Sequence, residues 1–269
     1  MKLLRIERIK ILNYLPFQIL LGLYVLAIVL GLVIYPLIDQ QIPVISLSDL
    51  FRFPDVWPFM TWVTEPYNIM LALIIIMITT NEFNNHTFKT QVVFGLGRRE
   101  LLSQKLMLIL ILALLATFLV AVTSVLLGLT HSYRLTFRIA MENTWMLLPY
   151  FLSSFTYMTF GLFFAVIIRN AALSILGFIG FRTFLEPVLF LILRKHEFKW
   201  FFPMRANTRL TPLPNLIEIF QEKMDQGEQP PQDILPEGPS LWASALVVLA
   251  YLALVIFLSY RLMQRKKLA

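Results

Sequence analysis

Six long apolar stretches run through this chain of 269 residues, and they constrain its fold more than any other feature. A bilayer core about 30 Å thick needs about 20 helical residues, because each residue advances a helix by about 1.5 Å. Charged residues make up only 14% of the chain, against about 25% in ordinary soluble domains. We therefore predict an all-α integral membrane protein, with one transmembrane domain over residues 1–269. Its six predicted spans cover approximately residues 14–38, 58–80, 106–130, 144–168, 171–193 and 241–260.

The distribution of Lys and Arg predicts how these spans are oriented. An even number of spans puts both termini on one side, together with the loop of residues 81–105 and Arg169. That side carries 13 of the 23 basic residues but only three of the 16 acidic ones. Because basic loops are retained in the cytoplasm, both termini are expected to be cytoplasmic. The basic residues flank the spans and form no separate basic domain, so membrane lipids are the expected partner and nucleic acid is not.

Metal and thiol chemistry have little support in the sequence. The chain has no cysteine, which excludes thiol catalysis, zinc–thiolate sites and iron–sulfur clusters. His86, His131 and His196 fall in different loops, and position 200 is Trp, so His196-Glu197 does not begin a metalloprotease motif. We therefore expect neither a metal site nor a catalytic residue.

The predicted cytoplasmic loop of residues 81–105 mixes charged and apolar side chains. Phe88, Val92 and Val93 are spaced as on one face of a helix, and a turn at residues 95–97 follows. Such an amphipathic segment suits either the membrane surface or a groove on a cytosolic partner. A solvated connector is the alternative interpretation.

The same loop resembles the ABC-2-type transporter permeases. The resemblance rests on Glu82 after span two, the run Thr87-Phe88-Lys89-Thr90, the turn Gly97-Arg98, and Lys105 opening span three. The number of spans, their orientation and the long loop before the last span also agree with that family. His86 departs from the family pattern, in which a glycine is common at that place.

This resemblance implies the membrane subunit of an ATP-driven exporter in a bacterial cytoplasmic (inner) membrane. Such a subunit works as a dimer of permeases, here a homodimer, with two cytosolic ATPase subunits. A short coupling helix between spans two and three would contact the ATPase, and residues 1–12 would form an interfacial helix. The chain lacks a Gly-x-x-x-x-Gly-Lys-Ser/Thr loop, so it is expected to bind no cofactor, and ATP would be used by the partner subunit. The resemblance places these residues in the coupling region: Glu82, Thr87, Lys89, Arg98, Arg99, Glu100 and Lys105.

Two charges interrupt the fifth apolar stretch. Arg182 and Glu186 are four residues apart, hence on one helix face, and Arg182 lies about 16 Å from the start of the span. An isolated charge costs several kcal/mol at that depth, which predicts an intramembrane charged pair. Pro187 disfavours regular helix at Glu186, which leaves open a break in the span. Two roles stay open: a lining of the translocation path or dimer interface, or a neutralised pair that holds this span against its neighbours.

Two other spans carry notable polar residues. In span two, Glu65-Pro66 predicts an interrupted helix, with Thr64 as a cap and Glu65 near one membrane face. In span four, Ser153 and Tyr157 share a face and are expected to pack helices together through hydrogen bonds.

Three other functions remain as alternatives to an exporter subunit. A non-transporting subunit would transmit force or a signal from an ATPase, although the loop of residues 194–240 is too small for a folded receptor domain. An intramembrane enzyme is disfavoured, because no span has a Ser/His or Asp/Asp arrangement, so we expect no enzymatic activity. An ion-driven carrier is disfavoured because repeated halves are not seen.

Overall fold

The computed structural model describes residues 14–39, 50–85, 87, 88, 93, 95, 97–132, 136–212 and 239–265. All regular structure in these residues is helical, which confirms the predicted all-α class. The predicted interfacial helix at residues 1–12 and Lys89 lie outside the described residues. The helices in chain order are α2 (Leu15–Asp39), α4 (Val56–Thr64), η1 (Glu65–Tyr67), α5 (Asn68–Asn84), α7 (Arg98–His131), α8 (Phe137–Met141), η2 (Thr144–Met146), α9 (Leu147–Ile168), α10 (Ala171–Gly180), η3 (Phe181–Leu185), α11 (Glu186–Ile192), η4 (Glu197–Phe201), α12 (Pro203–Thr208) and α14 (Leu241–Arg265).

Five stretches of the described chain are helical, long and apolar enough to cross a membrane. They are Val56–Asn84, Arg98–His131, Phe137–Ile168, Ala171–Ile192 and Leu241–Gln264, and they match the second to sixth predicted spans. At the first predicted span, a shorter apolar helix, Leu15–Gly31, is found. The chain is therefore a helical protein with five candidate membrane spans in its described residues.

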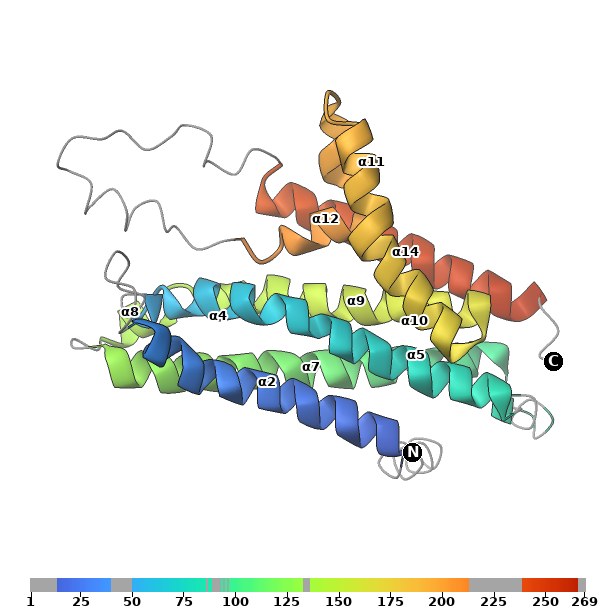
Figure 1. Cartoon of the computed structure of the whole chain (residues 1–269), viewed down its shortest axis with the longest axis horizontal. Coiled ribbons are helices and arrows are strands. Elements are labelled where there is room, and N and C mark those ends of the chain that lie inside the picture. The colour runs from blue at the N-terminus through green and yellow to red at the C-terminus, as the bar shows by residue number, and fades with distance from the viewer. Residues whose placement is uncertain are drawn as a thin grey trace.

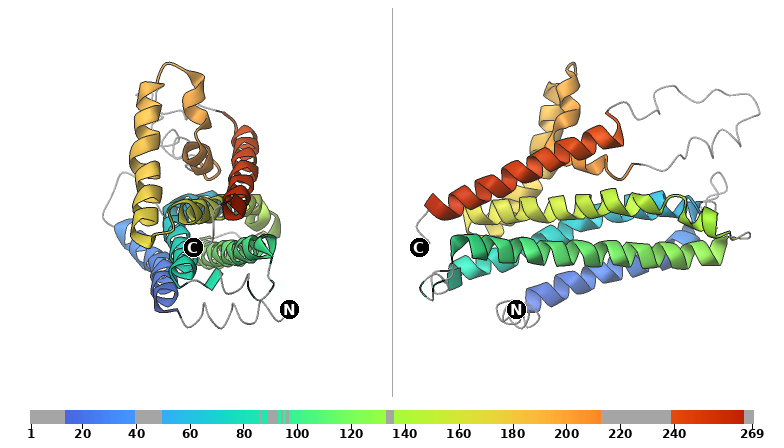
Figure 2. Two further views of the ribbon diagram at one scale, coloured as in Figure 1. Left: turned by 90° about the vertical axis from the view of Figure 1, so that its right-hand side faces the viewer. Right: turned by 180° about the vertical axis from the view of Figure 1, so that it is seen from behind.

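Helices α2, α4, α5, α7 and α9 form an elongated bundle with roughly aligned axes, whereas α10 and α11 rise away from it (Figure 1, Figure 2). Helix α14 runs obliquely beside the bundle and makes its most extensive contact with α9. The start of α2 and the end of α14 lie at the same end of the molecule as the end of α5 and the start of α7 (Figure 1). We call this end the α5–α7 end.

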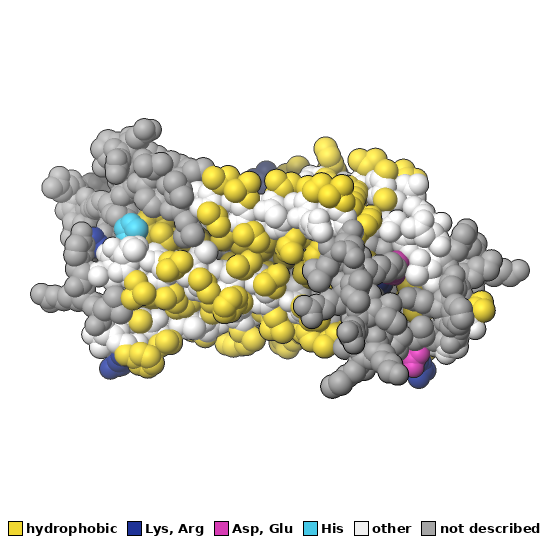
Figure 3. Space-filling model, turned by 90° about the horizontal axis from the view of Figure 1, so that it is seen from below, with side chains coloured by type: hydrophobic (Ala, Val, Ile, Leu, Met, Phe, Trp, Pro, Cys, Tyr) yellow, Lys and Arg dark blue, Asp and Glu magenta, His cyan; other side chains and the backbone are white. Residues whose placement is uncertain are grey.

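The bundle is apolar both inside and outside. Ile74 and Ile75 of α5, Ala113 of α7 and Met158 of α9 are completely buried in its core. On the face formed by α2 and α7, hydrophobic side chains cover the middle, and charged side chains lie mostly toward the ends (Figure 3). Soluble monomers rarely expose such extended apolar patches. This surface suits contact with lipid hydrocarbon.

Gly161 permits the close approach of α9 to α5. A Cβ atom at this position would lie 2.8 Å from the carbonyl oxygen of Ala72. We expect Gly161→Ala to push the two helices apart and to lower the free energy of unfolding by about 1–3 kcal/mol, measured by denaturant unfolding in detergent. Gly22→Ala in α2 is the matched control, because nothing lies within 4 Å of a Cβ there. Equal losses in the two variants would contradict the packing argument.

Candidate functional site

Glu65 lies between α4 and α5, where the helix is interrupted. Pro66 stands in the first turn of η1 and the helix tightens there, which confirms the predicted interruption. The predicted cap was wrong, because the Thr64 hydroxyl donates to the carbonyl oxygen of Met60 at 2.6 Å. Glu65 is 5% exposed and lies about 14 Å along its candidate span from Val56. A carboxylate is therefore buried inside the bundle.

The carboxylate of Glu65 has a partner on each of two other helices. One oxygen accepts a hydrogen bond from the hydroxyl of Tyr157 in α9. The other lies 3.6 Å from Nη2 of Arg182 in η3. The guanidinium of Arg182 also covers the ring of Tyr157, 4.7 Å from its centroid. These three residues, which we call the buried triad, join three separate helical segments.

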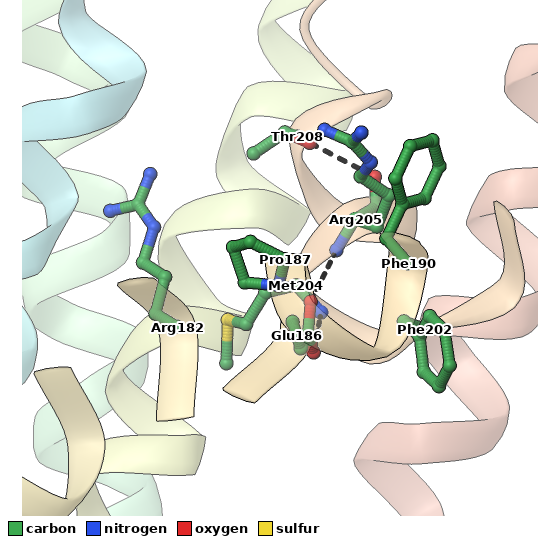
Figure 4. A pocket seen from close by; sticks show the side chains of 8 residues that line it. All are labelled: Arg182, Glu186, Pro187, Phe190, Phe202, Met204, Arg205 and Thr208. Carbon is green, nitrogen blue, oxygen red and sulfur yellow. Dashed lines mark hydrogen bonds between the residues drawn. The ribbon is translucent and has the colours of Figure 1, made fainter. Parts of the chain in front are cut away.

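The predicted pairing of Arg182 with Glu186 was wrong. Residues Phe181–Leu185 form a π-helical turn, in which hydrogen bonds span five residues instead of four. The wider turn means that residues four apart no longer lie one above the other. Within the described residues, Arg182 pairs with Glu65, while Glu186 accepts backbone N–H bonds from Met204 at 2.8 Å and Arg205 at 3.0 Å. Figure 4 shows the side chain of Arg182 pointing away from Glu186.

A chain of neutral hydrogen bonds joins three helices inside the bundle. Oδ1 of Asn68 in α5 accepts from the Ser154 hydroxyl at 3.0 Å and from the Tyr150 hydroxyl at 3.3 Å. The Tyr150 hydroxyl also lies 3.1 Å from the hydroxyl of Tyr24 in α2. These bonds tie α2 and α5 to α9 inside an apolar core.

Helix α12 folds back against α9 through a polar contact. Nδ2 of Asn207 donates to the Ser153 hydroxyl at 3.0 Å, and both side chains are buried. The interhelical bonds of Ser153 and Tyr157 agree with the packing role expected for this face of α9.

Two cavities flank the ion pair of the buried triad. One, of about 170 Å³, lies between α11 and α12 and is lined by Arg182, Glu186 and Thr208 among others (Figure 4). The other, of about 300 Å³, is lined by Glu65 and also by Thr208. Water or a small polar group in either cavity would reach one partner of the pair. Buried charges beside cavities within candidate spans are typical of solute pathways.

A second ion pair lies at the α5–α7 end. Nζ of Lys105 in α7 is 2.7 Å from Oε2 of Glu82 in α5, and each side chain is 2% exposed. The rings of Phe83 and Phe88 pack beside it, with centroids 4.6 Å apart. The guanidinium of Arg169, which follows α9, lies 5.0 Å from the centroid of Phe83. We call this group, Glu82, Phe83, Phe88, Lys105 and Arg169, the junction cluster.

The first turn of α7 is bound to α14. Nη1 of Arg98 donates to the carbonyl oxygens of Met263 and Gln264, and Nε of Arg99 donates to the Tyr260 hydroxyl. Oε2 of Glu100 accepts from the backbone N–H of Gly97 at 3.0 Å and so caps its own helix.

The predicted coupling residues thus fall into separate groups. Glu82 and Lys105 come together in a buried pair, while Arg98 and Arg99 bind α14. Thr87 is partly buried, and Lys89 lies outside the described part of the chain.

The sequence gives little indication of several residues that form the buried hydrogen bonds and the buried triad. Tyr24, Asn68, Tyr150 and Asn207 belong to no motif, and nothing local shows that they meet. Glu65 stands out as a charge in an apolar stretch, but its partners are 92 and 117 positions away, the first of them being Tyr157 and the second Arg182. Only a count of unpaired intramembrane charges could have linked Glu65 with Arg182.

The structure defines a helical protein whose described residues include five helices long and apolar enough to cross a membrane. Comparison of the chain with protein-family models, with curated proteins and with solved structures gave no match.

Proposed function

We propose that the chain is the six-span permease subunit of an ATP-driven exporter of the ABC-2 type. The observation that carries the proposal is the α5–α7 end, where the junction cluster and the contacts of Arg98 and Arg99 with α14 join four helices. A partner that pushes on this end would move α5, α7, α9 and α14 together. Force from an ATPase would therefore reach the bundle directly.

The segment between α5 and α7 has features of a docking element. Phe88 is 2% exposed and anchors the segment to the junction cluster, whereas Val93 is 78% exposed. An anchored segment that presents an exposed apolar side chain suits a groove on a cytosolic protein.

In the proposed topology, α2 is the first span in the chain and brings the total from five to six. Helix α2 has 25 residues, about 37 Å, which is enough to cross a bilayer core. With six spans both termini lie on one side, and the surplus of basic residues there makes that side cytoplasmic. The location is then a bacterial cytoplasmic membrane.

The buried triad supplies a polar lining inside the proposed transport subunit. Glu65 and Arg182 each border a cavity, so rearrangement of α10 and α11 would open or close a route between the two. The proposed partners of the chain are a second copy of it, membrane lipids, and a cytosolic ATP-binding-cassette ATPase. That ATPase uses the ATP. The chain itself is proposed to have no enzymatic activity and no cofactor.

The proposal predicts that Val93→Asp abolishes ATPase binding, because the charge would have to be buried in an apolar groove. The measurement is co-purification of a Walker-motif ATPase with the tagged full-length chain. Phe198→Asp is the matched control, since Phe198 is 77% exposed in η4, which contacts α11 and α12.

Two results would oppose this proposal. Absence of an ATPase from the purified wild type, or its retention by Val93→Asp, would contradict the docking role. An ATPase that binds but drives no export in vesicles would instead favour a subunit that transmits force or a signal.

A further inference from the structure

A group of cations surrounds two aromatic rings where α11, η4 and α12 meet. The guanidinium of Arg205 lies 4.0 Å from the ring centroid of Phe190, and that of Arg209 lies 4.1 Å from the centroid of Trp200. Nζ of Lys199 lies 5.0 Å from the same Trp200 ring. The two rings pack edge to face with centroids 5.3 Å apart. We call these five residues the basic–aromatic cluster.

The acidic side chain of α11, Glu186, is already engaged, and Glu197 of η4 is exposed two residues before Lys199. Both carboxylate oxygens of Glu186 accept backbone N–H bonds from the start of α12. Among the described residues, no carboxylate lies within 4 Å of the cationic group of Arg205 or Lys199. Burial and the neighbouring charge of Arg205 lower the pKa of Arg209 from its ordinary value. Positive charge is therefore concentrated here.

The geometry of Arg205 leaves its donors available. A guanidinium held beside an aromatic ring can still offer N–H groups to a phosphate, which it binds with two parallel hydrogen bonds. Arg205 is exposed, and with Phe190 it also borders the 170 Å³ cavity. A headgroup bound at Arg205 thus has a hollow beside it.

The surface next to the cluster is apolar. Leu191 and Ile192, which follow Phe190 in α11, are 67% and 70% exposed. Acyl chains can cover such side chains while the phosphate of the same molecule meets the cations. A small soluble anion would leave them uncovered.

We propose that the basic–aromatic cluster is a binding site for the phosphate headgroup of an anionic lipid, with Arg205 as its principal donor. The proposal concerns lipid binding alone and does not rest on coupling to an ATPase. Lys199 and Arg209 contribute charge, and the Phe190 and Trp200 rings hold the cations in place.

The test is native mass spectrometry of the full-length chain in neutral detergent with equal amounts of phosphatidylglycerol and phosphatidylcholine. The wild type is expected to retain phosphatidylglycerol preferentially. Arg205→Gln should weaken that retention about tenfold, because one charge-assisted contact is lost. Arg205→Lys, which keeps the charge without the planar fork, should fall between them.

Two controls make the result decisive. Arg138→Gln removes an exposed arginine from α8 and is expected to leave lipid retention unchanged. Denaturant unfolding of Arg205→Gln should differ from that of the wild type by about 1 kcal/mol or less, because the exposed Arg205 side chain contacts the Phe190 ring and forms no ion pair with a described residue. Unaltered phosphatidylglycerol retention in Arg205→Gln, or equal loss in Arg138→Gln, would overturn the site. Full displacement of the lipid by millimolar inorganic phosphate would overturn the lipid assignment.

Discussion

Arg182→Met alone is expected to lower the free energy of unfolding by about 3–5 kcal/mol, whereas Arg182→Met combined with Glu65→Gln should recover most of that loss. The single change leaves the Glu65 carboxylate buried with the Tyr157 hydroxyl, and among the described residues it has no second cation within 4 Å. The double change removes both charges while the glutamine oxygen still accepts from Tyr157. Denaturant unfolding of the purified chain in mixed micelles measures the difference.

Glu186→Gln provides the matched control for this cycle. Glu186 lies four residues from Arg182 but bonds to α12, so Arg182→Met and Glu186→Gln should have nearly additive effects. Strong coupling of Arg182 with Glu186, together with additive effects of Arg182 and Glu65, would contradict the arrangement described above. Export assays on the double variant would then show whether the buried triad is needed beyond stability.

Lys105→Met, at the α5–α7 end, is expected to lower the free energy of unfolding by a comparable amount. It leaves the charge of Glu82 in a site where that side chain is 2% exposed, which costs about 3–5 kcal/mol. Adding Glu82→Gln should restore most of the stability. Thermal unfolding gives the overall loss, and amide hydrogen exchange across the first turns of α7 locates it.

Glu100→Gln separates this buried effect from an ordinary surface effect. Glu100 is exposed and only caps α7, so its substitution should cost about 1 kcal/mol or less. The junction cluster would lose its assigned role if Glu100→Gln were as costly as Lys105→Met, or if the double variant at Glu82 and Lys105 were less stable than either single one.

The extent of α7 shows where a prediction from hydropathy falls short. The third span was predicted over residues 106–130, but α7 begins at Arg98, about two helical turns before the apolar stretch. Arg98 and Arg99 lie in the first turn of this helix, where α14 supplies carbonyl oxygens and a tyrosine hydroxyl that accept their hydrogen bonds. That contact joins residues more than 160 positions apart, so no local pattern reports it.

The predicted coupling residues show that prediction of functional contacts from the sequence has the same limit. Resemblance grouped Glu82, Arg98 and Lys105 as one contact region, and the structure does place all three at one end of the bundle. Burial, however, divides them into a pair inside the protein and an arginine bound to α14. The exposed fraction of a side chain depends on which segments pack over it, and the sequence does not show these segments.

The sequence by itself determined the helical class and the position of five candidate spans, because helix formation in an apolar stretch depends on length and local composition. It also marked Glu65-Pro66 as an interruption, since proline acts on its own turn. Only the tertiary structure decided the partners of the buried charges. The π-helical turn at Phe181–Leu185 directs Arg182 to a carboxylate on another helix, and that choice depends on packing between segments far apart in the chain.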